Sequence, residues 1–171
     1  MAVLDILHIP DPRLKQVSEP VQRFDDELRA FLADLEETRQ AGPAAVGIAA
    51  PQVGRPQCLV IVDCTHLRRP VPNHGHLVLA NPEITHWDGY EVGREGCLSV
   101  PDYTGNVIRA THIRLKAQDP QGAPLELTLE GFEARAVQHE LDHLDGLLFI
   151  DRVVSRRTDL FRRKVYQKGR G

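Results

Sequence analysis

The chain has 171 residues, enough for one domain whose core needs no disulfide staples. Its 21 basic and 24 acidic residues exclude a protein that coats free nucleic acid or an anionic membrane with its whole surface. Three cysteines do not make a secreted disulfide framework, and so we expect a reducing, cytoplasmic setting. We expect neither a signal peptide nor a membrane span, because residues 1–13 lack an uninterrupted apolar core and no later run could cross a bilayer.

The first part of the chain predicts a helix and then a strand. Asp25 offers a cap to a helix whose apolar residues recur at helical spacing, and Gly42 and Pro43 end it. These apolar residues are Leu28, Phe31, Leu32 and Leu35. The β-branched run 58–62 is typical of a buried strand, whereas stretch 68–75, which contains glycine and proline, is typical of a surface loop.

The remaining chain predicts strands followed by two helices. Strand-like segments lie at Leu77–Leu79, Glu83–Glu91, Val107–Gln118 and Leu125–Leu129. Residues 119–122 predict a hairpin turn, and helices are expected from Phe132 to Leu144 and from Arg156 to Lys168. The fold class is therefore α+β, with mostly antiparallel β-sheets around a central metal-binding helix, an N-terminal helix and a C-terminal basic helix. We expect a single domain over residues 1–171.

Charge is segregated along the chain. Residues 152–171, called the basic extension below, carry eight basic side chains and one acid, for a net charge of +7. Residues 1–151 carry a net charge of −10. The basic extension is a candidate contact for an acidic partner, although a solvated amphipathic helix would carry the same charges.

The segment Gln138-His139-Glu140-Leu141-Asp142-His143 contains an HExxH pattern. Residues four apart share one face of a helix, so His139 and His143 can hold one metal ion while Glu140 moves protons beside it. A catalytic site of this kind usually has three protein ligands and one open position, and Cys97 is the best candidate for the third ligand. The alternative is an ordinary amphipathic helix with a chance pair of histidines.

Three separated segments resemble, in order, the signature motifs of one family. They are Val46-Gly47-Ile48-Ala49-Ala50-Pro51-Gln52-Val53-Gly54, Glu95-Gly96-Cys97-Leu98-Ser99 and Gln138-His139-Glu140-Leu141-Asp142-His143-Leu144-Asp145-Gly146. On these motifs the chain resembles the peptide deformylases, over most of its length from Pro10 to Asp151. The resemblance implies removal of the formyl group from the N-terminal formyl-methionine of new polypeptides, with release of formate. Its expected partners are N-formylmethionyl nascent peptides.

The resemblance also implies roles for individual residues. The implied metal ligands are Cys97, His139 and His143. Glu140 would take a proton from water and pass it to the departing nitrogen, and the Gln52 side chain and the Leu98 backbone N–H would stabilise the oxyanion. Without the resemblance, Gln52 would be read as a solvated loop residue. The native metal would be ferrous iron, Fe(II), for which zinc, nickel or cobalt can substitute, since a thiolate suits softer ions.

Substrate binding is expected to use main-chain atoms, because the enzyme must accept many sequences after the methionine. Gly47 and Ile48 would pair with an extended peptide as an added strand, and Gly96 would line the opposite side. Arg135 and Ala136 lie near His139 on the expected helix, next to the methionine pocket. Arg135 departs from the apolar residue common in bacterial members. Its alternative reading is an arginine whose stem packs while its charge reaches solvent.

Other positions bear on the resemblance. Ala45 stands where the family often has glycine, and Thr104 stands where an arginine often borders the cleft. Glu95 and Arg109 fit a family pair in which the acid supports the metal loop, whereas an exposed ion pair of little energetic value is the alternative.

Two other functions remain open on the sequence. An HExxH metallopeptidase would share the helix and the general base, although Cys97 and Gln52 disfavour it. A catalytically inactive, ribosome-associated homologue would use the basic extension alone. The resemblance also implies that an active enzyme could contact the ribosome through the same extension.

Overall fold

The structure is a computed structural model that describes residues 2–163. Its α-helices are α1 (Asp26–Ala41) and α2 (Gly131–Leu144), and its 3-10 helices are η1 (Pro12–Lys15), η2 (Ala50–Val53) and η3 (Phe149–Asp151). The strands are β1 (Gly47–Ala49), β2 (Leu59–Asp63), β3 (His76–Asp88), β4 (Glu91–Cys97), β5 (Val100–Arg109), β6 (His112–Gln118), β7 (Pro124–Glu130) and β8 (Leu160–Arg162). None of the described helices is long and apolar enough to cross a membrane.

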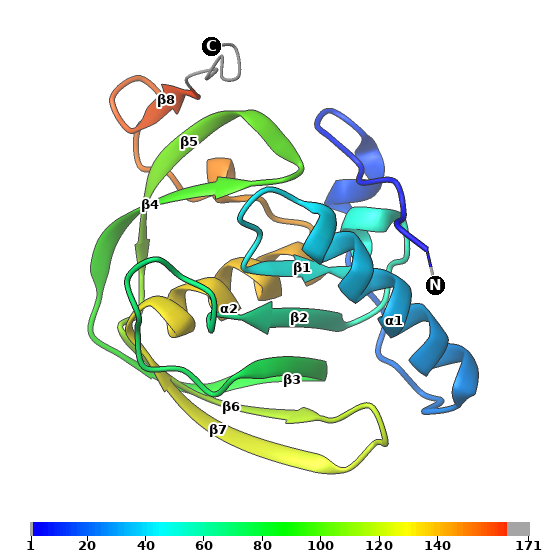
Figure 1. Cartoon of the computed structure of the whole chain (residues 1–171). Helices are drawn as coiled ribbons and strands as arrows, with labels where there is room; N and C mark the ends of the chain where they lie inside the picture. The colour runs from blue at the N-terminus through cyan, green and yellow to red at the C-terminus, as the bar shows by residue number, and fades with distance from the viewer. Residues whose placement is uncertain (1, 164–171) are drawn as a thin grey trace.

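The strands form two antiparallel sheets (Figure 1). The larger sheet has the strand order β1-β2-β3-β6-β7, and the smaller one has the order β4-β5-β8. All strand pairs between neighbours are antiparallel. The expected mixture of helices with antiparallel sheets is confirmed.

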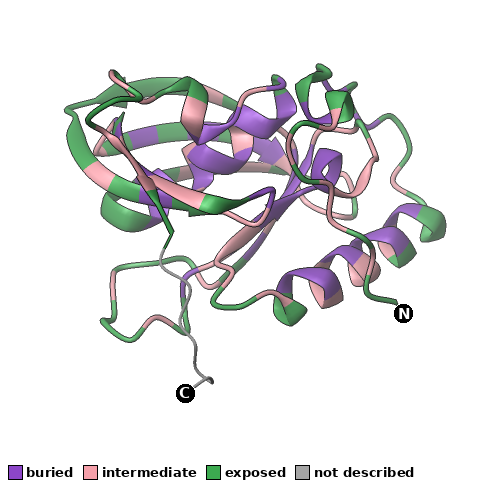
Figure 2. Cartoon of the chain, turned by 90° about the horizontal axis from the view of Figure 1, so that it is seen from above, coloured by how far each residue is buried: buried purple, intermediate pink, exposed green. Residues whose placement is uncertain are grey.

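The two α-helices cover opposite faces of the larger sheet at β1 and β2. In β2, Leu59 and Ile61 pack in the cluster of α1, whereas Val60 and Val62 pack in the cluster of α2. Successive side chains of a strand point to opposite faces, so a strand covered on both sides must be apolar throughout. This explains the uninterrupted apolar run that predicted β2. The buried side of α1 is visible in Figure 2.

Helix α1 begins where its sequence predicts. The Asp25 side chain accepts a hydrogen bond from the Leu28 backbone N–H at 3.0 Å, which satisfies one of the free donors of the first turn. The four apolar residues at helical spacing are all buried against the sheet. The helix ends at Ala41, directly before Gly42.

The predicted break between two strands after Leu79 is wrong, because β3 runs through it. Asn81 and Pro82 are turn residues, but here they form an irregularity within one long strand. The Asn81 side chain bonds both the N–H and the C=O of Val21, at 2.7 and 3.0 Å, and so ties the irregularity to the segment before α1. The strand also ends at Asp88 rather than at Glu91.

The predicted single strand Val107–Gln118 is also wrong, because it spans two strands in different sheets. Strand β5 begins earlier, at Val100, and the chain leaves it at Ala110 to enter β6. The Gln138 side chain of α2 bonds the N–H and the C=O of Ala110, at 3.0 and 2.9 Å. A helix side chain therefore satisfies the backbone at the point where the sheet pairing stops.

The predicted C-terminal helix Arg156–Lys168 is wrong over residues 156–163, and its remainder lies outside the described residues. Strand β8 forms there instead and pairs with β5 through Tyr103–Arg162, Thr104–Phe161 and Gly105–Leu160. The Arg94 guanidinium lies 3.9 Å from the centre of the Phe161 ring. Pairing with a free sheet edge and this cation–π contact favour the extended chain over a helix.

Candidate active site

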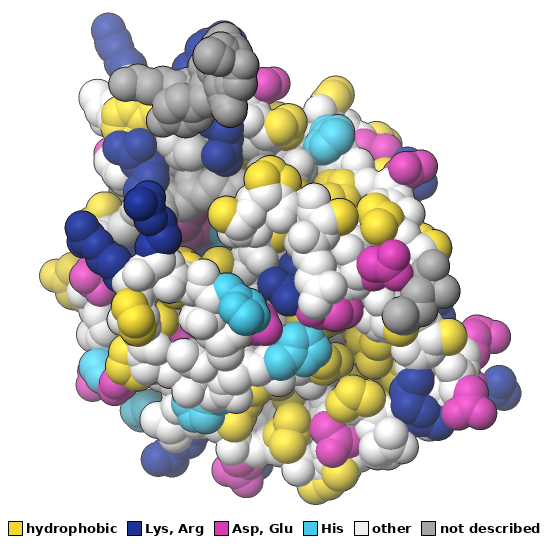
Figure 3. All heavy atoms as spheres, viewed as in Figure 1, with side chains coloured by type: hydrophobic (Ala, Val, Ile, Leu, Met, Phe, Trp, Pro, Cys, Tyr) yellow, Lys and Arg dark blue, Asp and Glu magenta, His cyan; other side chains and the backbone are white. Residues whose placement is uncertain are grey.

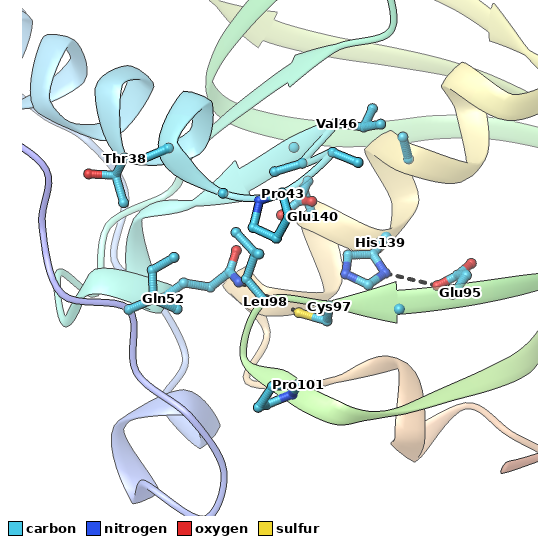
Figure 4. A pocket seen from close by; sticks show the side chains of 18 of the residues that line it. Thr38, Pro43, Val46, Gln52, Glu95, Cys97, Leu98, Pro101, His139 and Glu140 are labelled. Atoms are coloured by element: carbon cyan, nitrogen blue, oxygen red, sulfur yellow. Dashed lines mark hydrogen bonds and ion pairs between the residues drawn. The ribbon is translucent and has the colours of Figure 1, made fainter. Parts of the chain in front are cut away.

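Helix α2 and the end of strand β4 bring three side chains together that can hold a metal ion. Two of them, Cys97 and His139, are labelled in Figure 4. The ligand atoms of Cys97, His139 and His143 all lie within 4.8 Å of one another. The Cys97 Sγ lies 3.4 Å from the His143 Nε2. The histidines share one helix face because they are four residues apart, whereas the cysteine comes from the smaller sheet.

The donor set fits a cation. Burial lowers the pKa of His143 well below its usual value, which favours the neutral imidazole, the form that binds metals. Burial also acts to lower the pKa of His139, but its contacts with Cys97 and Glu95 outweigh this and raise the pKa well above its usual value. The surroundings of His139 therefore favour a positive charge. Among residues 2–163, the buried Nδ1 of His143 has no hydrogen-bond partner.

Glu95 orients one of the histidines. Its Oε1 accepts a hydrogen bond from the His139 Nδ1 at 2.8 Å, which turns the Nε2 of that ring toward the other two ligands. Arg109 donates to both carboxylate oxygens of Glu95 at 2.8 Å. Burial alone would raise the pKa of Glu95, but the bonds from Arg109 and His139 hold it well below its usual range. Both partners of the expected Glu95–Arg109 pair are buried, so the alternative of an exposed pair is wrong.

Gln52 is buried, with 1% of its surface exposed, so the reading as a solvated loop residue is wrong. Its Oε1 accepts a hydrogen bond from the Ala49 N–H at 2.9 Å, which fixes the orientation of the amide. Its Nε2 then lies 3.1 Å from the Ser99 Oγ and 3.6 Å from the Cys97 Sγ. The amide donors therefore point to the ligand cluster.

Glu140 lies beside the ligands with an unpaired oxygen. Its Oε1 is buried and has no hydrogen-bond partner among the described residues. Burial raises the pKa of Glu140 to about 7, although the nearby His139 acts in the opposite direction. A cation held by the neighbouring ligands would favour the ionised form.

One cavity of about 930 Å³ contains nearly all of the predicted site residues. Its lining includes Gly47, Gln52, Gly96, Cys97, Leu98, Arg135, Ala136, His139 and Glu140. Ile48 is not on the lining, because its side chain is buried in the cluster of α1, and only its main chain could contact a peptide. His143 lies behind the lining, with 1% of its surface exposed.

Several residues that organise the site were not predicted from the sequence. The Ser99 hydroxyl accepts a hydrogen bond from the Gln52 amide, and the Asp142 carboxylate accepts one from Arg109 at 2.6 Å. Both lie inside the recognised motifs, which is the signal that could have identified them. Nothing in the sequence indicated that Arg135 is buried and bonds Glu95 at 2.8 Å, so the reading with its charge in solvent is wrong.

A cation site of one thiolate and two imidazoles, flanked by a buried carboxylate and a buried amide, defines a metal-dependent hydrolase. Residues 3–159 match the model of the family described as polypeptide deformylase. The chain belongs to that family.

Relatives and solved structures agree with this assignment. The peptide deformylase of Alkalilimnicola ehrlichii is 44% identical, over 96% of this chain and 90% of that protein. The peptide deformylase of Acidobacterium capsulatum is 40% identical, over 96% of this chain and 95% of that protein. The crystal structure of the Thermotoga maritima peptide deformylase has a TM-score of 0.83 and 36% identity, over 91% of this chain and 100% of that chain. The crystal structure of the Synechococcus elongatus peptide deformylase in complex with actinonin has a TM-score of 0.82 and 38% identity, over 92% of this chain and 82% of that chain.

Proposed function

We propose that the cavity between β1, β4 and α2 is the site at which this chain hydrolyses the N-formyl group of formyl-methionyl nascent polypeptides. The family consists of metal-dependent hydrolases with this activity. The observation that carries the assignment is the convergence of Cys97, His139, Glu140 and Gln52 on one cavity, next to the buried His143.

Cys97, His139 and His143 are the proposed metal ligands. A divalent ion bound there would supply an activated water and polarise the formyl oxygen. Glu95 and Arg109 keep the ring of His139 aligned for this purpose, because the carboxylate holds the Nδ1 and the guanidinium holds the carboxylate.

Glu140 is the proposed proton carrier. Its free Oε1 faces no competing donor among the described residues, so it can accept the proton of the attacking water. The same carboxyl group then delivers the proton to the methionine nitrogen as the C–N bond breaks. Formate and a free amino terminus are the products.

Gln52 and Leu98 are the proposed oxyanion donors. The Ala49 N–H holds the oxygen of the Gln52 amide, so its NH₂ group stays directed to the cavity without reorganisation during the reaction. Leu98 follows the ligand Cys97 and also lines the cavity, where its backbone N–H would be the second donor.

The methionine-containing peptide is proposed to bind along β1. This strand is at the edge of the larger sheet, so one side of its backbone lacks a strand partner in that sheet. Gly47 and Ile48 would pair with an extended peptide, while Gly96 borders the cavity from β4. Ala136 and the stem of Arg135 contribute to the wall next to the methionine side chain.

Fe(II) is the proposed native ion, and zinc, nickel or cobalt are the proposed substitutes. The thiolate of Cys97 favours softer ions than an all-oxygen site would. Metal analysis of protein purified without oxygen tests this, and we expect iron together with loss of activity in air. Zinc as the only bound metal, with full activity, would contradict the choice of iron.

Formate release tests the function itself. Protein loaded with Fe(II) under anaerobic conditions should release formate from a formyl-methionyl peptide and leave the same peptide uncut when it lacks the formyl group. Internal cleavage of the unformylated peptide would favour the metallopeptidase. Absence of any release at full metal occupancy would favour an inactive homologue.

Ribosome contact through residues 156–170 is a separate proposal. Lys and Arg side chains gather around β8 on one face of the molecule (dark blue in Figure 3). Because β8 belongs to the smaller sheet, the informative variant ends at residue 163 and keeps that strand. It should bind ribosomes more weakly, with a smaller salt dependence, and retain activity on short peptides. Equal ribosome affinity of the two proteins would refute a contact through the deleted residues 164–170 and leave these as a solvated segment.

A further inference from the structure

We infer that Arg135 is a positioning residue of the metal site, which fixes Glu95 and thereby His139, and that Gly93 provides the space for its guanidinium. The inference rests on the metal site in the proposed function. In this inference the charge of Arg135 serves to hold Glu95, and not to contact substrate or solvent.

The guanidinium of Arg135 is buried and makes three hydrogen bonds. Its Nη1 donates to the Glu95 Oε2 at 2.8 Å and to the Val107 carbonyl at 2.9 Å, and its Nη2 donates to the Glu91 carbonyl at 2.7 Å. Only 9% of the residue is exposed. Arg135 therefore joins α2 to β4 and β5, the two strands on either side of the turn that follows Cys97.

Arg135 completes the hydrogen bonding of Glu95. The Oε1 of Glu95 accepts from His139 and Arg109, and its Oε2 accepts from Arg109 and Arg135, each at 2.8 Å. Two donors on each oxygen match the capacity of an ionised carboxylate. Without Arg135, the buried Oε2 would keep one donor, and the fork of Arg109 would be the main remaining restraint on the carboxylate. Because the other oxygen holds His139, any shift of the less restrained carboxylate would misalign a metal ligand.

Gly93 makes room for this arrangement. A Cβ atom at Gly93 would lie 2.7 Å from the Arg135 Cζ and 2.8 Å from its Nε. A long flexible side chain could normally move away, but this guanidinium is held by bonds to three groups in a buried space. A methyl group at position 93 must therefore break some of these bonds. Gly93 and Arg135 form a matched pair.

Arg39 provides a control for the loss of any buried arginine. It is as buried as Arg135 and also makes three hydrogen bonds, to both oxygens of Glu36 and to the Ala45 carbonyl. It lies on α1 and makes no bond to Glu95. Arg39→Met should therefore lower stability and leave the metal ligands undisturbed.

The test loads the full chain with Co(II) and follows two properties: the visible and thiolate absorption bands, and the rate at which a chelator removes the ion. We expect Arg135→Met to lose cobalt roughly tenfold faster and to shift the bands, since supporting residues of this kind change metal affinity by about 10–100-fold. Arg135→Lys should restore part of the retention, because one ammonium cannot replace the planar fork. Equal retention and an unchanged spectrum in Arg135→Met would overturn the inference, and so would equal losses in Arg39→Met.

Gly93→Ala tests the same idea with Arg135 still present. In the wild-type background it should speed cobalt loss, whereas in the Arg135→Met background it should add little, because the clash is gone. Additive effects of the two substitutions would overturn the matched pair. The wild-type spectrum separates the proposed metal site from the proposed role of Arg135. A missing thiolate band in the cobalt-loaded wild-type protein would contradict the metal site itself. Differences between the variants and the wild-type protein report on Arg135.

Discussion

At the scale of single residues, two buried glutamates of the site, Glu95 and Glu140, have opposite surroundings. Glu95 is saturated with donors, which hold its pKa well below the usual range, whereas Glu140 has an unpaired oxygen and a pKa raised by burial to about 7. A saturated carboxylate can orient a neighbour but cannot accept a proton. The unsaturated one is suited to proton transfer, which separates a supporting role from a chemical one.

Glu140→Gln should strongly reduce turnover and keep the metal. The amide has nearly the same shape but cannot carry the proton, so we expect kcat to fall by about 10²–10⁴-fold. Formate release and metal content are measured on the same sample. Glu133→Gln is the control, because Glu133 is a buried acid of the same helix that bonds His74 and does not line the cavity. Turnover near the wild-type level in Glu140→Gln would contradict the assigned role.

The Cys64 thiol should be inert in the folded protein. Burial, with smaller contributions from Glu133 and Asp63, raises its pKa to about 12, so almost no reactive thiolate exists at pH 8. Alkylation with iodoacetamide, read by peptide mass spectrometry, should label Cys64 only after unfolding in urea. Labelling in the native state at the unfolded rate would show that the residue is accessible and ionisable.

At the scale of elements, the close approach of β1 to α2 determines the geometry of the site. Strand β1 has only three residues, and its first residue, Gly47, faces Glu140. A Cβ atom at Gly47 would lie 2.6 Å from the Glu140 Oε2, so a larger residue there would displace the Glu140 carboxylate unless the strand moved away from the helix. The free edge of the same strand is the proposed binding surface for an extended peptide.

Gly47→Ala should therefore lower kcat strongly while it changes the melting temperature only slightly. The methyl group would push the Glu140 carboxylate away from its position, and displacement by about 1 Å can cost on the order of 10²-fold in rate. The backbone of β1 is unchanged, so we expect a smaller effect on KM. Steady-state kinetics measure kcat and KM, and thermal unfolding measures stability. A variant with wild-type kcat would show that Glu140 tolerates the contact.

At the scale of the whole molecule, the proposed ion joins parts built from different cores. Cys97 comes from the smaller sheet, whereas His139 and His143 come from a helix that packs on the larger sheet. Arg109 spans the same boundary, since it lies on β5 and bonds Asp142 of α2. An ion that binds only the folded arrangement stabilises it by mass action.

Metal removal should therefore lower the melting temperature. An ion at a thousand times its Kd contributes about 4 kcal/mol, which for a chain of this size is roughly 10 °C. Differential scanning fluorimetry with and without a chelator measures the difference. Cys97→Ser should strongly reduce this difference in melting temperature. Cys58→Ser, at a thiol outside the ligand cluster, should preserve the difference. Equal melting temperatures for the loaded and chelated wild-type protein would contradict a site of this strength.

Local patterns in the sequence determined the features that depend on neighbouring residues. The cap at Asp25, the apolar spacing of α1 and the pairing of His139 with His143 all follow from helix geometry within a few residues. The three motifs also identified the family. The extent of a single domain over residues 1–171 stays a prediction.

Only the tertiary structure decided the features that depend on contacts between distant segments. Strand β3 runs through Asn81 because its residues pair with β2 before the irregularity and with β6 after it, and residues 160–162 form β8 because β5 offers a free edge. Arg135 is a supporting residue only because Gly93 and Glu95, about 40 positions away, meet it in the folded chain. Helix periodicity shows which face Arg135 occupies, but burial and donor saturation are properties of the packed molecule.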